Sequence, residues 1–201
     1  MVKVKICGVR DIGFALGASQ MNIHALGFNF YPESKRYIAP AAAKKIIDAL
    51  PPFINRVGVF VNAPIDTVRE TADYLKLDYV QLHGDETEEY AAALTGYKII
   101  KAVRVFNETP EHIEKLLSKY RYLLLDAGSS TEYGGTGKQF DWNLLDRIKN
   151  ARNIIVAGGI NPNNVSELLK HNPYAIDVNS GIEDDAGNKS IKKLEKILSL
   201  I

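Results

Sequence analysis

The chain is poor in cysteine, with Cys7 the only one among 201 residues. A single thiol cannot close a disulfide within the chain, which fits a protein of a reducing compartment. Histidine is scarce as well, and the four histidines show no metal-ligand spacing with Cys7. The sequence therefore predicts neither a disulfide framework nor a metal site.

An excess of charge of one sign is missing too. Lys and Arg number 25 against 24 Asp and Glu, so the net charge is +1 and no basic field would hold nucleic acid. No apolar run is long enough to cross a bilayer, and the start "MVKVKICGVR" lacks the apolar core of a signal peptide. These absences predict a cytoplasmic protein without nucleic-acid or membrane partners.

What the chain does have is a repeating alternation of strand and helix patterns. Amphipathic stretches at 39–50, 63–76, 109–120 and 161–171 indicate helices, several with Pro, Thr or Asn at the start. Between them recur short runs rich in β-forming residues, at 2–6, 24–30, 56–61, 79–83, 98–103, 122–127, 153–159 and 175–181. Strands joined by helices form a parallel sheet, because each helix returns the chain to the same edge.

Eight such units favour a closed (β/α)8 barrel, of the TIM type, in the α/β class. The alternative is an open doubly wound sheet, which needs fewer strands and usually a glycine fingerprint after the first one; here only Gly8 is present. Nothing in the composition marks a linker, so residues 1–201 are expected to form a single barrel domain. The start at Met1 and the helical end suggest a free-standing enzyme.

In such a barrel the chemistry lies where the strands end. Asp126 ends the apolar run "YRYLLLD"; burial disfavours an ionised carboxylate, which suits a general acid, although a cap beside "GSST" is the structural alternative. Cys7 ends the first strand. An unpaired cysteine is more often a small buried hydrophobe, but Lys5 or loop amides could lower the thiol pKa enough for a base or nucleophile.

Two glycine-bearing turns, "AGGINP" and "NSGIE", follow the last two strands, where barrels commonly bind phosphate. Asn161 and Pro162 are predicted to cap and begin a helix whose positive end points into this site. The alternative is a pair of tight turns that bind nothing.

Three further segments are candidate ligand-binding elements. "EYGGTGKQF", residues 132–140, is not a nucleotide P-loop, since Glu132 stands at the required glycine and Gln139 replaces Ser or Thr; it fits a loop that folds over a ligand, or simple flexibility. Arg36 in "PESKRYIAP" could pair with a substrate carboxylate or belong to a solvated basic loop. Gln81 and His83 are expected at the same mouth of the barrel, where the strands end. A histidine that is only hydrogen-bonded at the end of its strand is favoured over a catalytic base, so the predicted chemistry does not include His83.

Taken together, these segments resemble the phosphoribosylanthranilate isomerase family of tryptophan biosynthesis. The resemblance covers essentially the full chain in order, and it is carried by "KICG", "GFNFYPESKRYI", "VGVFVN", "VQLHGDE", "LLLDA", "GGTGKQFDW", "AGGINPNNV" and "DVNSGIE".

The resemblance implies an aldose-ketose isomerase, an intramolecular oxidoreductase on a (β/α)8 barrel. It would catalyse the Amadori rearrangement of N-(5-phosphoribosyl)anthranilate to 1-(2-carboxyphenylamino)-1-deoxyribulose 5-phosphate, with no cofactor or metal. It gives Cys7 the role of general base and Asp126 that of general acid.

The same resemblance implies which residues bind the substrate. Arg36 would hold the anthranilate carboxylate, and Asp177 would lie near the sugar hydroxyls, although it could equally be structural. Asn179, where a serine is expected, departs from the family pattern, as does "AGSSTEY" at 127–133. The phosphate would lie at the turns that contain Gly158, Gly159, Ser180 and Gly181. The assembly is expected to be a monomer or a homodimer.

Two rival functions stay open at this point. The related isomerase of the histidine pathway performs the same chemistry on a two-phosphate substrate, but it would carry an aspartate where Cys7 stands. A catalytically idle barrel that only binds a phosphorylated ligand or a partner protein is the second rival, and the presence of both Cys7 and Asp126 argues against it.

Overall fold

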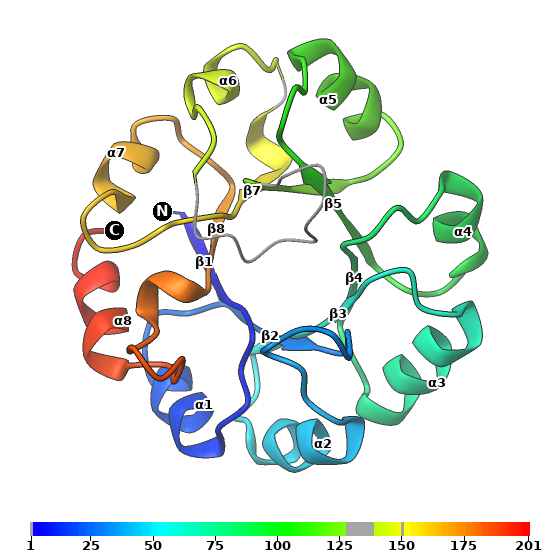
Figure 1. The fold of residues 1–201 in the computed structure, drawn as a ribbon, viewed down its shortest axis with the longest axis vertical. Coiled ribbons are helices and arrows are strands. Elements are labelled where there is room, and N and C mark those ends of the chain that lie inside the picture. Colours follow the sequence, from blue (N-terminus) through cyan, green and yellow to red (C-terminus); the bar gives the residue numbers. More distant parts are fainter. Residues whose placement is uncertain (1, 128–138, 150) are drawn as a thin grey trace.

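The computed structural model describes residues 2–127, 139–149 and 151–201. Within them, eight parallel strands pair in chain order and β1 pairs with β8, so the barrel is closed, as predicted (Figure 1). The open-sheet alternative is wrong. The strands are β1 (Lys3–Ile6), β2 (Ala25–Asn29), β3 (Asn55–Phe60), β4 (Tyr79–Leu82), β5 (Ile99–Arg104), β6 (Tyr122–Asp126), β7 (Ile154–Val156) and β8 (Ala175–Val178).

Helices surround the barrel (Figure 1). Several begin where the sequence supplies a capping side chain: Asp11 accepts the backbone N–H of Phe14 at the start of α1, and Thr109 accepts that of His112 at the start of α5. The helices are α1 (Ile12–Ser19), α2 (Pro40–Ala49), α3 (Ile65–Leu75), α4 (Glu88–Ala93), α5 (Pro110–Leu117), α6 (Asn143–Asp146), α7 (Val165–Leu169) and α8 (Ile191–Leu198), with 3₁₀ turns η1 (Ala151–Asn153) and η2 (Ser180–Ile182).

The side-chain alternation of the strands divides the core into two layers. In β6, Leu123 and Leu125 belong to the large cluster between the barrel and its helices, whereas Leu124 belongs to the smaller cluster inside the barrel. Because both faces are buried, the strand is a continuous apolar run. Asp126 lies two residues beyond Leu124 and therefore shares the inward direction.

The predicted start of α7 is wrong. The regular helix begins at Val165, not at Pro162, and is only five residues long. The side chain of Asn164 accepts the backbone N–H of Asn161, and that of Asn161 accepts the N–H of Asn163, so these residues form a separate turn before the helix. Such a short helix gives little support to the predicted dipole effect.

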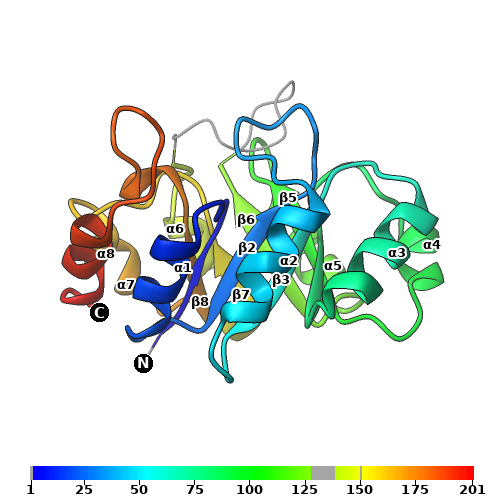
Figure 2. The same ribbon diagram turned by 90° about the horizontal axis from the view of Figure 1, so that it is seen from below.

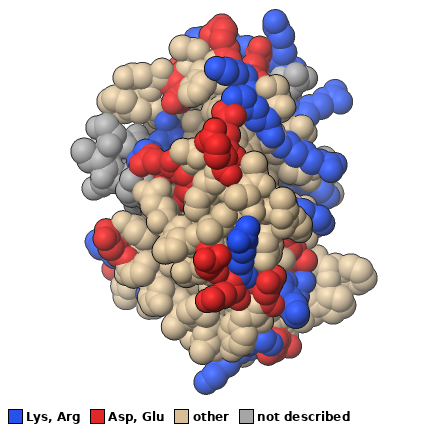
Figure 3. Space-filling model, turned by 90° about the vertical axis from the view of Figure 1, so that its right-hand side faces the viewer, with Lys and Arg blue, Asp and Glu red and all other residues tan. Residues whose placement is uncertain are grey.

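The loops that follow the strands gather on one side of the barrel, the upper side in Figure 2. On the face shown in Figure 3, acidic and basic side chains are interspersed. A search of the described helices finds none with the length and apolar character needed to cross a membrane.

Candidate active site

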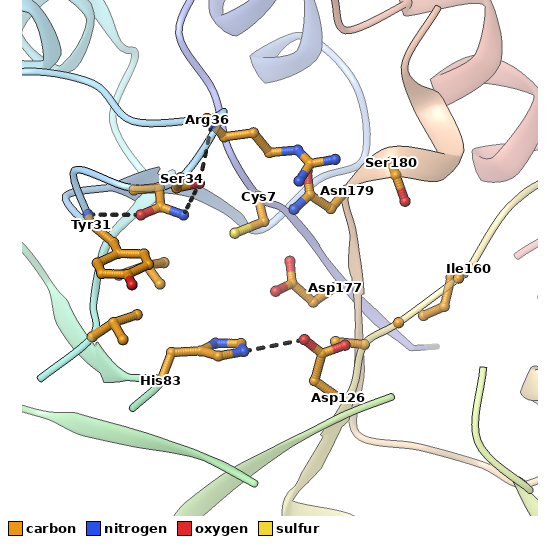
Figure 4. Close-up of a pocket in the computed structure, with 16 residues that line it drawn as sticks. Cys7, Tyr31, Ser34, Arg36, His83, Asp126, Ile160, Asp177, Asn179 and Ser180 are labelled. Atoms are coloured by element: carbon orange, nitrogen blue, oxygen red, sulfur yellow. Dashed lines mark hydrogen bonds and ion pairs between the residues drawn. The ribbon is translucent and has the colours of Figure 1, made fainter. Parts of the chain in front are cut away.

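A pocket lies at the mouth of the barrel where the strands end (Figure 4). Most residues predicted for the site line it together, although they come from distant parts of the chain. Its lining comprises Cys7, Asn29, Tyr31, Ser34, Arg36, Val59, Val61, His83, Asp126, Ala157, Gly158, Gly159, Ile160, Asp177, Asn179 and Ser180. The predicted loop over the ligand falls largely on residues 128–138, outside the described residues.

Cys7 is a free thiol, only 7% exposed, just beyond the end of β1. Burial raises the pKa of the Cys7 thiol; the ammonium of Lys5 lowers it, but the Asp177 carboxylate acts in the same direction as burial, and the net pKa lies above the ordinary value. The expectation of a lowered thiol pKa is therefore wrong.

Lys5 and Asp177 form a buried ion pair beneath Cys7, with 2.6 Å between Nζ and Oδ2. Burial disfavours the ammonium, but Asp177 and Cys7 more than offset this effect and hold the pKa of Lys5 above its ordinary value. Burial also raises the pKa of Asp177, which Lys5 offsets only in part. The other carboxylate oxygen, Oδ1, is buried without a hydrogen-bond partner among the described residues. A ligand hydroxyl in the pocket would satisfy it.

Asp126 lies opposite, 6% exposed, and its Oδ2 is 3.2 Å from Nε2 of His83 (Figure 4). The other ring nitrogen of His83 lies 2.8 Å from the side-chain nitrogen of Gln81. If the Gln81 amide donates to Nδ1, the hydrogen of the neutral ring is on Nε2 and is donated to Asp126. His83, which the sequence analysis left out of the chemistry, therefore contacts the predicted acid. The signal in the sequence is the spacing: His83 directly follows β4, two residues after Gln81, which places both side chains on the same side of the chain.

The two glycine-bearing turns lie against each other at the edge of the pocket. A Cβ on Gly181 would lie 1.8 Å from the carbonyl oxygen of Ile160, so the two backbones approach as closely as only glycine permits. Gly158, Gly159 and Ile160 line the pocket, and their backbone N–H groups have no acceptor among the described residues. Unpaired N–H groups at a mouth of this kind suit an anion.

Arg36 also lines the pocket, and it is already paired. Its Nε and Nη2 donate to the two carboxylate oxygens of Glu183 at 2.7 and 2.8 Å. A guanidinium has five N–H donors, so three remain for another acceptor. Glu183 was missed in the sequence because one carboxylate in a loop, 147 residues from Arg36, carries no periodic signal.

A closed parallel barrel with a thiol, two carboxylates and two glycine-bearing turns around one mouth defines a (β/α)8-barrel enzyme. Residues 4–199 match the family model described as N-(5'phosphoribosyl)anthranilate (PRA) isomerase. The chain belongs to this family, and the predicted isomerase activity of tryptophan biosynthesis is confirmed.

Individual relatives agree with the family model over nearly the whole chain. The N-(5'-phosphoribosyl)anthranilate isomerase of Citrifermentans bemidjiense is 44% identical, over 99% of this chain and 96% of the relative. The solved phosphoribosyl anthranilate isomerase of Thermus thermophilus has a TM-score of 0.89 and 37% identity, covering 99% and 98% of the two chains. A further isomerase structure, in complex with reduced 1-(o-carboxyphenylamino)-1-deoxyribulose 5-phosphate, has a TM-score of 0.83 and 36% identity, covering 99% and 97%.

Proposed function

We propose that Asp126 is the general acid and Cys7 the general base of the rearrangement of N-(5-phosphoribosyl)anthranilate in this pocket. One observation carries the proposal. The ends of β1 and β6, far apart in the sequence, bring the thiol and the carboxyl group to the same cavity. A substrate held between them would meet an acid and a base together.

Before the final tautomerisation, the chemistry needs one proton given to the ring oxygen of the ribose and one removed from C2. Asp126 protonates the ring oxygen of the ribose, the bond from this oxygen to C1 breaks, and a Schiff base forms between C1 and the anthranilate nitrogen. Cys7, as thiolate, then removes the proton at C2. The electron pair moves to give an enolamine, which relaxes to the ketone when C1 takes up a proton and the hydroxyl group on C2 releases one. Every atom of the substrate is kept, so the reaction is an isomerisation.

The remaining pocket groups match the two charged ends of this substrate. The phosphate is proposed to bind at the turns with Gly158, Gly159, Ser180 and Gly181, supported by the unpaired N–H groups there. The ring carboxylate is proposed to bind the free donors of Arg36. A sugar hydroxyl is proposed to donate to Oδ1 of Asp177.

The test compares wild type with Cys7→Ala and Asp126→Asn. The labile substrate is generated in situ, and the loss of its anthranilate fluorescence is followed. Each variant is expected to lose a factor of about 10² to 10⁴ in kcat, the usual contribution of one acid or base. Melting temperatures check that the variants are folded. Wild-type turnover in either variant would refute the role of that residue, and an inactive wild type would favour the idle barrel.

The setting of the enzyme is proposed as well: one barrel domain over residues 1–201, working in the cytoplasm as a monomer or a homodimer. One feature favours the homodimer. Phe53, in the turn between α2 and β3, is 96% exposed, and its backbone has a positive φ of 74°. Aromatic residues are enriched at protein interfaces, so this exposed ring supports the choice of a homodimer. Sedimentation of wild type and Phe53→Ser would decide between the two states.

A further inference from the structure

The loop after β8 places a carboxylate against Arg36. Glu183 directly follows η2, and Arg36 lies in the loop after β2; Figure 2 shows both loops on the side where the strands end. Both side chains are largely buried, with 18% of Arg36 and 11% of Glu183 exposed. A planar, bidentate pair of this kind fixes the plane of the guanidinium as well as its position.

Lys189 holds Glu183 from the other side. Its Nζ is 2.8 Å from a Glu183 oxygen, 2.6 Å from the side-chain oxygen of Asn179 and 3.0 Å from the Asn179 carbonyl. These three acceptors fit the three donors of an ammonium group. Glu183 and Lys189 are also joined by an antiparallel backbone bridge, so the loop closes on itself. Asn179, the departure from the family pattern, is thereby fixed at the pocket wall.

The aliphatic part of the Arg36 side chain is fixed as well as its guanidinium group. Gly8 has a positive φ of 72°, and a Cβ at this position would lie 2.7 Å from Cδ of Arg36. The arginine stem therefore packs on bare backbone beside Cys7. Together, Gly8, Glu183 and Lys189 leave Arg36 little freedom to change rotamer.

The charges of Arg36, Lys189 and Glu183 together favour the binding of one carboxylate. Burial alone would raise the pKa of Glu183, but hydrogen bonds from Arg36 and Lys189 lower it to about 2, so Glu183 is ionised at neutral pH. Within the group of Arg36, Lys189 and Glu183, two cations and one anion leave one positive charge without a partner. A monoanionic carboxylate neutralises this charge.

We propose that Glu183, held by Lys189, is a positioning residue that fixes Arg36 so that its remaining N–H groups bind the carboxylate of the substrate. The inference rests on the proposed role of Arg36. It assigns Glu183 no contact with the substrate. Its effect is to order Arg36 before the substrate arrives, which reduces the entropy lost on binding.

The test uses Glu183→Gln, which keeps the size of the side chain and removes its charge. KM for the substrate is expected to rise about three- to tenfold, the cost of ordering one long side chain on binding, while kcat stays within about twofold. Inhibition constants are also measured for two stable analogues, the reduced product and the same molecule without the ring carboxylate. Only the analogue with the carboxylate should bind more weakly.

A matched control exists elsewhere in the chain. Arg56 and Asp78 form an equally bidentate pair at 2.7 and 2.9 Å, in the part of the barrel where the strands begin. Asp78→Asn should lower the melting temperature without changing KM or either inhibition constant. If Glu183→Gln does not fold, Glu183→Asp carries the test, because it keeps the charge and withdraws the carboxylate by one methylene.

Variants of Arg36 and Glu183 distinguish the positioning role of Glu183 from the proposed role of Arg36 in binding the carboxylate. If Arg36→Met leaves the binding of the carboxylate analogue unchanged, the proposed role of Arg36 fails, and the inference fails with it. If Arg36→Met weakens this binding and Glu183→Gln does not, only the inference fails. Equal weakening of both analogues by Glu183→Gln would also overturn the inference, because it would indicate general damage to the pocket. In the Arg36→Met background, Glu183→Gln should have no further effect.

Discussion

The two ends of the barrel are built from the same eight strands and differ sharply in chemistry. Where the strands end, the pocket is lined by ionisable side chains, including the buried Asp126 and Asp177 and the partly buried Arg36. Where they begin, a cavity of about 170 Å³ is lined mainly by apolar and aromatic side chains such as Ile155 and the rings of Tyr79, Tyr122 and Tyr174.

Lys5 joins the two ends. It lines the apolar cavity, and its ammonium group reaches Asp177 at the polar mouth. The side-chain period of β1 explains this placement, since Lys5 and Cys7 both face inward while Val4 and Ile6 pack against the helices. One end of the barrel can therefore carry the catalytic groups while the other end stabilises the fold.

Removing the charge that joins the two ends should have the largest effect. Lys5→Met leaves Asp177 buried without a partner, which is expected to cost about 3 to 5 kcal/mol of unfolding free energy. Because burial raises the pKa of Asp177, protonation of this carboxyl group should keep the loss near the lower value. Denaturant titration measures the change. The double variant Lys5→Met with Asp177→Leu should recover most of the stability, and a double variant as unstable as the single one would contradict the explanation.

The next effect concerns pH and activity. Since burial raises the pKa of the Cys7 thiol above its ordinary value of 9.0, the thiolate fraction should limit the reaction at neutral pH. We expect kcat/KM to increase about tenfold for each pH unit between about pH 7 and 9. The residual activity of Cys7→Ala should lack this rise. A wild-type profile that is already flat at neutral pH would argue against Cys7 as the base.

The two ends should also lose stability at opposite extremes of pH. Glu183, at the polar mouth, has its pKa lowered from 4.5 to about 2, so its contribution to stability is complete above pH 4.5 and is lost as the pH falls toward 2. For Tyr174, at the apolar end, burial and the neighbouring Tyr122 raise the pKa from 10.0 to about 12, so its contribution is complete below pH 10 and is lost as the pH rises toward 12.

Melting curves across pH test this pair of expectations. The difference between wild type and Glu183→Gln should shrink only in acid, and the difference between wild type and Tyr174→Phe only in alkali. A pH-independent difference for either variant would show that its ionisation does not contribute to stability.

The smallest effect is expected from the apolar end alone. Ile155→Val removes one methylene group from the wall of the cavity and should cost about 0.5 to 1.5 kcal/mol of unfolding free energy. KM and kcat should stay unchanged, since Ile155 does not line the pocket at the mouth. A change in kcat greater than twofold would mean that the two ends are coupled through the barrel interior.

The sequence was sufficient to predict the strands, the closed barrel and the meeting of Cys7 with Asp126, because parallel strands place their ends at one edge. Periodicity could not reveal the start of α7, since Asn161 and Asn164 satisfy each other's backbone in a turn before the helix. It also could not predict the direction of the Cys7 pKa shift, which depends on the balance between burial and the charges of Lys5 and Asp177.

Contacts between loops also could not be predicted from the sequence, because they depend on how the folded chain brings distant residues together. Glu183 and Lys189 sit in a loop without helical or strand period, and only the folded chain brings them to Arg36. The contact of His83 could have been predicted, because His83 directly follows β4 and its position two residues after Gln81 places both side chains on the same side of the chain.

The most direct test of the paired acid and base is a crystal structure of this enzyme with the reduced product analogue bound. We predict the sulfur of Cys7 within about 4 Å of C2 and a carboxylate oxygen of Asp126 within about 3.2 Å of the oxygen on C4, with the phosphate at the turns containing Gly159 and Ser180. A sugar chain bound away from Cys7 and Asp126 would contradict the mechanism. So would a complex in which the two side chains lie on the same side of C2 and the sulfur of Cys7 cannot reach the hydrogen on C2.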